Sequence, residues 1–123
     1  MPFTDEEIIR AYYHFQQTRA DEDFWVWQEV DSMCHDLNSG LRITEKLIES
    51  APTAFSRDCI AAGPLEDLVY RFPTTAVPAI AEIAERSEKM RKALMGVNVD
   101  DDSPALAPWN ALLIKHHGTT GEL

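Results

Sequence analysis

The sequence predicts an all-α fold, a compact irregular bundle of about five to six short helices, with α-solenoid-like stacking as the alternative arrangement. Three observations lead to this prediction. Apolar residues recur at steps of three and four along most of the chain, which is the spacing of a buried helix face. Residue types that begin or end helices separate these stretches. The alternation of apolar and polar residues that is typical of strands is essentially absent.

The first helix is expected to begin after Thr4, because Glu7 follows it at the spacing of a capping box. In that motif the hydroxyl accepts from the backbone of the third helical residue, whose carboxylate reaches back to the cap. The helix is expected to end near Arg19. Its buried face is expected to carry Ile8, Tyr12 and Phe15.

A second helix is predicted from a cap at Asp21 to about Leu37. Its apolar positions fall at helical spacing and are expected to be buried. They are Phe24, Trp27, Val30, Cys34 and Leu37. The run 38–40, Asn-Ser-Gly, reads as a stop signal because a glycine there can adopt the left-handed conformation that ends helices.

An amphipathic helix is predicted over 41–50, closed by Pro52. Helical spacing resumes over 59–72, where the pair Gly63-Pro64 leaves open whether there are two helices or one kinked helix. If Gly63 is a cap and Pro64 the first helical residue, Glu66 falls at the third position and can close back on the Gly63 N–H.

The remaining helices follow from breakers at intervals along the chain. Pro78 suits the first turn of a helix, where its missing N–H would have no partner. Ser87 is expected to interrupt this helix, and Gly96 is expected to end it. The run 98–108 is predicted to be an acidic loop. Trp109, Leu112 and Leu113 are expected to form a last helical turn on the body, followed by a frayed tail over 116–123.

Length and charge limit the possible classes of function. A chain of 123 residues suits one helical domain over 1–123, with enough apolar material for an ordinary core. The net charge is −10, from 21 acidic against 11 basic side chains. Such a field repels phosphate backbones, so direct nucleic-acid binding is not expected, whereas a basic protein would be attracted.

The predicted location is the cytoplasm. The chain starts Met1-Pro2-Phe3-Thr4 and turns acidic at once, unlike a secretion signal, and no apolar run approaches the roughly 20 residues that cross a bilayer. No membrane association is therefore expected. Two isolated cysteines, Cys34 and Cys59, are expected to be buried free thiols in a reducing compartment, with a bridge between them as the alternative.

No residue is predicted to be catalytic, to bind a cofactor or to hold a metal. Cys34 and His35 are adjacent on a helix and therefore point apart, so a buried structural cysteine is the better interpretation. The adjacent pair His116-His117 has the wrong spacing for one helical face. Glu66 and Asp67 are explained by helix initiation, because carboxylates are expected in a first turn.

The stretch 60–69, IAAGPLEDLV, resembles a bacterial family of uncharacterised small domains whose hallmark reads close to AAGPLEDLL. The likeness extends over residues 24–110. The sequence departs from the family at Asn98, where relatives often have tryptophan, and at 71–73, where they often have His-Gly. The resemblance implies a helical architecture and a bacterial cytoplasmic origin, and it carries no activity or site residue to this chain.

The favoured hypothesis is an acidic protein-interaction module, for instance an immunity or inhibitor protein that binds a basic effector. The residues expected to contact the partner are Asp21, Glu22, Asp23, Trp25, Asp100, Asp101 and Asp102. The motif Gly63, Pro64, Leu65, Glu66 and Asp67 is interpreted as a structural helix start. One alternative is a regulatory domain that self-associates through apolar surface around Trp25 and Trp109, and another is a small enzyme that uses Glu66 and Asp67 with a histidine.

Overall fold

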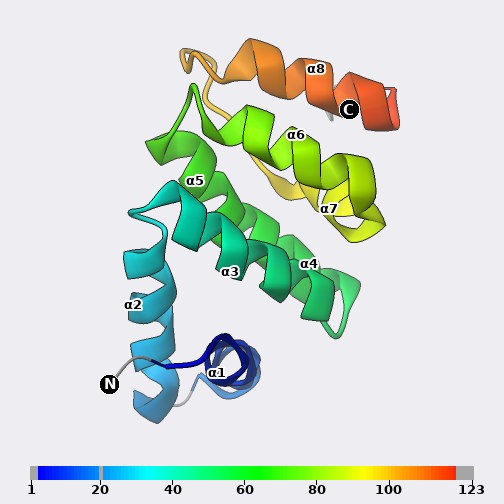
Figure 1. Cartoon of the computed structure of the whole chain (residues 1–123). Coiled ribbons are helices and arrows are strands. Elements are labelled where there is room, and N and C mark those ends of the chain that lie inside the picture. The colour runs from blue at the N-terminus through cyan, green and yellow to red at the C-terminus, as the bar shows by residue number, and fades with distance from the viewer. Residues whose placement is uncertain (1–2, 20, 119–123) are drawn as a thin grey trace.

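The computed structural model describes residues 3–19 and 21–118, and all regular secondary structure in these residues is helical. The predicted all-α class is confirmed. The described part contains eight α-helices, and because two of them continue into each other through a π-turn, they form seven helical segments instead of the predicted five to six. Figure 1 shows α1 at one end of the molecule and α8 at the opposite end, with the other helices between them.

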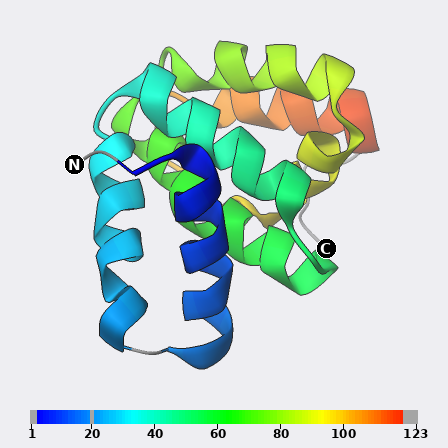
Figure 2. The ribbon, with the colours of Figure 1, turned by 60° about the horizontal axis from the view of Figure 1, so that its bottom comes forward.

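The N-terminal third is a helical hairpin, in which α1 (Asp5–Thr18) lies beside α2 (Phe24–Met33) after a 3₁₀ turn over Asp21–Asp23 (Figure 2). The predicted capping box is confirmed, with the Thr4 hydroxyl accepting from the Glu7 amide and the Glu7 carboxylate accepting from the Thr4 amide. The cap predicted at Asp21 is wrong. Asp21 begins the 3₁₀ turn, and the side chain at the α2 cap makes no capping hydrogen bond.

The predicted end of the second helix near Leu37 is also wrong, because α2 stops at Met33 and α3 (Leu37–Ser50) has already begun. Asp36 caps α3 by accepting a hydrogen bond from the amide of Ser39. The run 38–40, predicted to stop a helix, therefore lies inside one. A short polar side chain suits either a cap or a turn, so the sequence alone does not distinguish the two.

Gly40 is buried within α3 because two neighbouring elements approach its backbone. A Cβ atom at this position would lie 2.8 Å from the Cα of Cys34 and 2.8 Å from Cδ2 of Leu68. The glycine thus allows the first turn of α3 to pack directly on the end of α2 and on the helix that carries Leu68. Its role is close packing and not the left-handed conformation of a helix end.

The C-terminal half contains α6 (Ala76–Arg86), α7 (Glu88–Ala93), a 3₁₀ turn over Leu94–Gly96 and α8 (Leu106–His117). Pro78 lies in the first turn of α6, as predicted. Ser87 separates α6 from α7 and caps α7 by accepting from the amide of Met90. Residues 106–108 of the predicted loop belong to α8, as do residues 116–117 of the predicted tail, and 119–123 lie outside the described residues.

The core is one continuous cluster of side chains from every α-helix. Trp109 is 1% exposed and confirms that the C-terminal tryptophan packs on the body. The predicted buried face of the second helix is only partly correct. Val30 and Cys34 are buried, whereas Phe24 and Trp27 are 45% and 49% exposed. No described helix is both long and apolar enough to span a membrane.

Polar contacts at Asp5 hold α1 against α3. The Asp5 carboxylate accepts from Nζ of Lys46 at 2.7 Å and from Nε of Arg42 at 3.1 Å. The hydrogen bond from Arg42, followed by the one from Lys46, lowers the pKa of Asp5 below its usual range. The hydroxyl of Tyr13 on the same helix donates to the carbonyl of Leu47. These contacts dock the hairpin onto α3.

Replacing Gly40 with alanine is expected to lower the free energy of unfolding by about 1–3 kcal/mol, because the new methyl group must displace a backbone atom in a packed site. The exposed neighbour Asn38 serves as the control. Asn38→Ala introduces the better helix former in the same turn and is expected to be neutral or stabilising. Urea denaturation measures both, and an unchanged midpoint for Gly40→Ala would contradict the close approach.

Asp5→Asn is expected to lower stability by about 1 kcal/mol at neutral pH, because it removes the charged partner of two cations. The pKa of Asp5 is lowered in the folded state, so its contribution is complete above the ordinary aspartate pKa and disappears as the pH falls through the lowered value. Melting curves of the wild type and the variant should therefore converge at acidic pH. Glu6→Gln, at an exposed position of the same turn, is the control and should differ little from the wild type at neutral pH.

Candidate functional site

A single continuous helical rod runs through the middle of the chain, formed by α4 (Ala54–Ile60), a π-helical turn (Ala61–Leu65) and α5 (Glu66–Arg71). We call these three elements the rod. The amide of Glu66 donates to the carbonyl of Ala61, the wider spacing that defines a π-turn. Such turns within α-helices occur frequently at functional sites.

Pro64 explains why the turn is wide. In a regular α-helix its ring would collide with the carbonyl of Ile60, and it has no N–H to donate to that carbonyl. Gly63 precedes it and carries no Cβ, which removes the clash that usually keeps a residue before proline out of the helical region. The Gly-Pro pair is thus accommodated by the π-turn without a break in the rod.

This geometry corrects the interpretation of the motif as a helix start. Gly63 is not a cap and Pro64 is not a first helical residue, because both lie inside the π-turn. Leu65 is fully buried in the core. Glu66 does not close back on Gly63 either. The open question of two helices or one kinked helix is settled in favour of one continuous rod.

The rod instead holds the segment 97–105, which connects the last 3₁₀ turn to α8. Oε1 of Glu66 accepts a hydrogen bond from the backbone amide of Asn98 at 2.8 Å. Gly96 lies so close to the π-turn that a Cβ there would be 2.8 Å from the Cβ of Ala61. Two stretches that are distant in the sequence are therefore packed on each other, and Asp100 is brought beside the motif.

An open hollow of about 340 Å³ lies between the rod and the segment 97–105. Three carboxylates line it, those of Glu66, Asp67 and Asp100, and we call it the acidic hollow. Tyr70 and Ser103 add a ring and a hydroxyl to its wall. The described residues that line it include no lysine or arginine, so a cation would enter a site of negative potential.

Two further hollows adjoin the π-turn and share Gly63 with the acidic hollow. One, of about 200 Å³, lies between α2 and the rod and includes Val30, Cys34 and Pro64 in its lining. The other, of about 320 Å³, extends toward Phe55 and Cys59 on α4. Both are lined by Tyr12, Trp27 and Gly63. We call these two hollows together the apolar trough.

A small polar network closes one end of the trough. Nε of Arg71 donates to Asp67 at 2.8 Å, and another nitrogen of the same guanidinium lies 3.6 Å from Asp31. His35 is 3.4 Å from Arg71 and 3.7 Å from Asp31. The hydrogen bond to Asp67 raises the pKa of Arg71. Arg71 thus contacts both Asp67 and Asp31.

The thiols and imidazoles do not assemble into a reactive or metal-binding group among the described residues. Burial, with a smaller contribution from the charge of Asp67, raises the pKa of the Cys34 thiol to about 11. Cys34 is buried and His35 exposed, as predicted from their adjacent positions. Cys59 is half-buried. Nε2 of His117 lies 2.6 Å from the carbonyl of Arg91.

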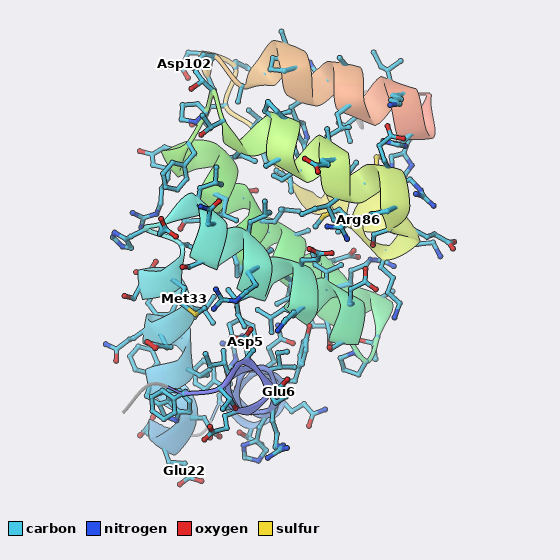
Figure 3. The ribbon with its side chains drawn as sticks, viewed as in Figure 1. Asp5, Glu6, Glu22, Met33, Arg86 and Asp102 are labelled. Atoms are coloured by element: carbon cyan, nitrogen blue, oxygen red, sulfur yellow. The ribbon has the colours of Figure 1, made fainter. Side chains whose placement is uncertain are left out.

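The structure separates the two acidic clusters that were predicted to form one binding face. Glu22 and Asp102 lie at opposite ends of the molecule (Figure 3). Asp21 and Glu22 are exposed, whereas Asp23 contacts Nδ1 of His14. Asp100 lines the acidic hollow, and Asp101 and Asp102 are exposed in the turn that follows.

Trp25 is half-buried and stacks on Phe3 at a centroid distance of 4.0 Å, so it is not the exposed ring of its helix. Together with the burial of Trp109, this contradicts the apolar patch expected around these two tryptophans. The most exposed rings are those of Phe3, Phe24, Trp27, Phe55 and Tyr70. The exposure of Phe55 and Tyr70 was not predicted from the sequence. The spacing of apolar residues in the rod does not show whether another helix packs on these two rings.

A family of unknown function, DUF6869, matches residues 14–110. The chain belongs to this family. The match confirms the resemblance to an uncharacterised family, and it spans the whole rod and the segment that packs on it. No curated protein and no solved structure matches the chain.

Glu66→Ala is expected to release the segment 97–105 and to cost about 1 kcal/mol of local stability, because the Asn98 amide loses a charged acceptor. Glu66→Gln is the matched control, since its amide oxygen can still accept. Hydrogen exchange followed by NMR should show faster exchange at Asn98 in the alanine variant than in the glutamine variant. Equal exchange in both would show that the Glu66 side chain does not hold this segment.

Proposed function

We propose that this protein is an acidic helical interaction module that binds a basic protein, in the manner of an immunity or inhibitor protein that binds a basic effector. The observation that carries the proposal is the acidic hollow, which is lined by Glu66, Asp67 and Asp100 and by no lysine or arginine among the described residues. Asp67 pairs with Arg71 from outside the lining, so Glu66 and Asp100 supply the excess charge. A cationic side chain of a partner would complete this arrangement of charges.

The distribution of ion pairs also supports the binding of a basic partner. Most of the basic side chains are already paired with carboxylates of the protein itself. They are Arg42, Lys46, Arg57, Arg71, Arg86, Lys92 and Lys115. The surplus acids therefore remain as an unneutralised field, and a field of this kind accelerates encounters with a partner of opposite charge.

The two acidic clusters take different parts in this proposal. Asp100, Asp101 and Asp102 are at or beside the acidic hollow and would contact the bound partner directly. The cluster at Asp21 and Glu22 lies at the opposite end of the molecule (Figure 3). Its contribution is expected to be long-range attraction, which affects the association rate more than the dissociation rate.

Self-association is the second candidate, and the exposed rings of Phe24, Trp27 and Phe55 favour it. Apolar side chains gathered on one surface often mark an interface. The net charge of −10 opposes the approach of two copies, most strongly at low salt. Light scattering over a range of concentration and salt separates the candidates, since a protein that remains monomeric throughout removes self-association.

Asp100→Lys is expected to weaken binding of the basic partner about tenfold or more, because it places a like charge in the acidic hollow. Affinity capture from the source cells at low and moderate salt, with quantitative mass spectrometry, provides the partner and the measurement. Glu82→Lys changes the net charge equally at an exposed position on α6 and should have a much smaller effect. Equal losses for the two variants would show that net charge alone, and not the hollow, governs binding.

A further inference from the structure

Aromatic side chains from three elements surround the apolar trough and are only partly covered by the protein itself. Phe24 and Trp27 on α2 are 45% and 49% exposed and stack on each other at 5.9 Å between ring centroids. Phe15 of α1 meets Phe24 edge to face. Phe55, across the trough on α4, is 77% exposed. Rings of this size are costly to leave in water.

The floor of the trough is made of small residues. Cys59, Ala62 and Gly63 of the rod line it, and even a methyl group added at Gly63 would meet only the Tyr12 hydroxyl, 4.0 Å away. The backbone of the rod is therefore accessible to another element at close range. Large rings at the rim with small residues on the floor form a groove that can receive side chains from outside.

The excess of negative charge lies where the trough meets the acidic hollow. Asp31 and Asp67 line the inner end of the trough and both contact Arg71, and Asp67 also lines the acidic hollow. Arg19 lines the outer end of the trough, with its guanidinium over the ring of Phe15 at 5.5 Å. Glu66 and Asp100 therefore supply the charge that favours a cationic occupant, and they lie beside the inner end.

We propose that the apolar trough and the acidic hollow together receive one amphipathic, cationic α-helix of the basic partner. This inference rests on the proposed function and specifies the recognised element. Apolar side chains of the helix enter the trough between Trp27 and Phe55, and its lysine or arginine side chains reach Asp67 and Asp100. Helix-in-groove recognition of this kind uses anchors at steps of three and four residues.

The dimensions agree with a helical occupant. Phe55 and Tyr70 mark the two ends of the combined surface along the rod, a length of roughly 22 Å at the rise of an α-helix. This corresponds to about four helical turns of a partner. The described residues contain no strand that could be extended by an added strand, so the exposed groove is the surface available for a secondary-structure element.

Two synthetic 18-residue peptides of leucine, alanine and lysine test the inference. One places its leucines on one helical face and the other has the same composition in scrambled order, so the two carry the same charge. Both are titrated into the ¹⁵N-labelled full chain. The amphipathic peptide is expected to bind about tenfold more tightly, with shift changes concentrated at the lining of the trough and of the acidic hollow.

Two pairs of variants locate the binding. Ala62→Gln fills the floor of the trough, and Ala111→Gln makes the same change at an exposed alanine of α8. Phe55→Ala removes an exposed ring, and Ile114→Ala shortens a side chain that is 53% exposed on α8. The variants at Ala62 and Phe55 are expected to reduce the preference for the amphipathic peptide about tenfold, and their controls to leave it unchanged.

The outcomes separate this inference from the proposed function. Equal binding of the two peptides, unaffected by Ala62→Gln but weakened by Asp100→Lys, would overturn the helix-in-groove inference and leave the acidic interaction module standing. The helix-in-groove inference would also be overturned if a partner captured from cells bound the Phe55→Ala and Ala62→Gln variants as tightly as the wild type. A dimer of the protein alone that dissociates on Phe55→Ala would assign the trough to a second copy and overturn the inference.

Discussion

A proline inside a helix is the constraint on which the middle of this molecule depends. Pro64 cannot continue a regular α-helix, and the chain accommodates it with a π-turn instead of a break. The rod therefore remains one element while its side-chain register changes at the π-turn. The acidic hollow and the apolar trough adjoin at this turn, and Gly63 lines both.

Two other glycines bring the rest of the fold onto the rod. Gly40 allows α3 to approach Leu68 of α5, and Gly96 allows the C-terminal half to approach Ala61 of the π-turn. Both contacts are so close that a Cβ atom at either glycine would overlap its neighbour. The rod is thereby enclosed from two directions, and the acceptor at Glu66 then positions the segment that carries Asp100. The packing of the helices on the rod and the geometry of the acidic hollow both depend on these close approaches.

The surface around the rod combines features that a stable monomer usually minimises. Three carboxylates converge with only Asp67 paired, to Arg71, among the described residues, and several large rings remain exposed. Each feature destabilises the isolated protein slightly, through repulsion between like charges or through hydrated apolar surface. A partner with the opposite charge and an apolar face would relieve both, and this is the physical basis of the proposed interaction.

The sequence by itself determined the features that depend on neighbouring residues. The capping box at Thr4, the proline in the first turn of α6 and the interruption at Ser87 are local interactions, so they could be predicted correctly, as could the all-α class. The tertiary structure decided what depends on distant segments. A glycine reads the same at a helix end and at a close contact, which is why Gly40 was misinterpreted. The exposure of Phe24 and Trp27 and the contact of Glu66 with Asn98 depend on which helices pack together, and helical periodicity contains no information on that choice.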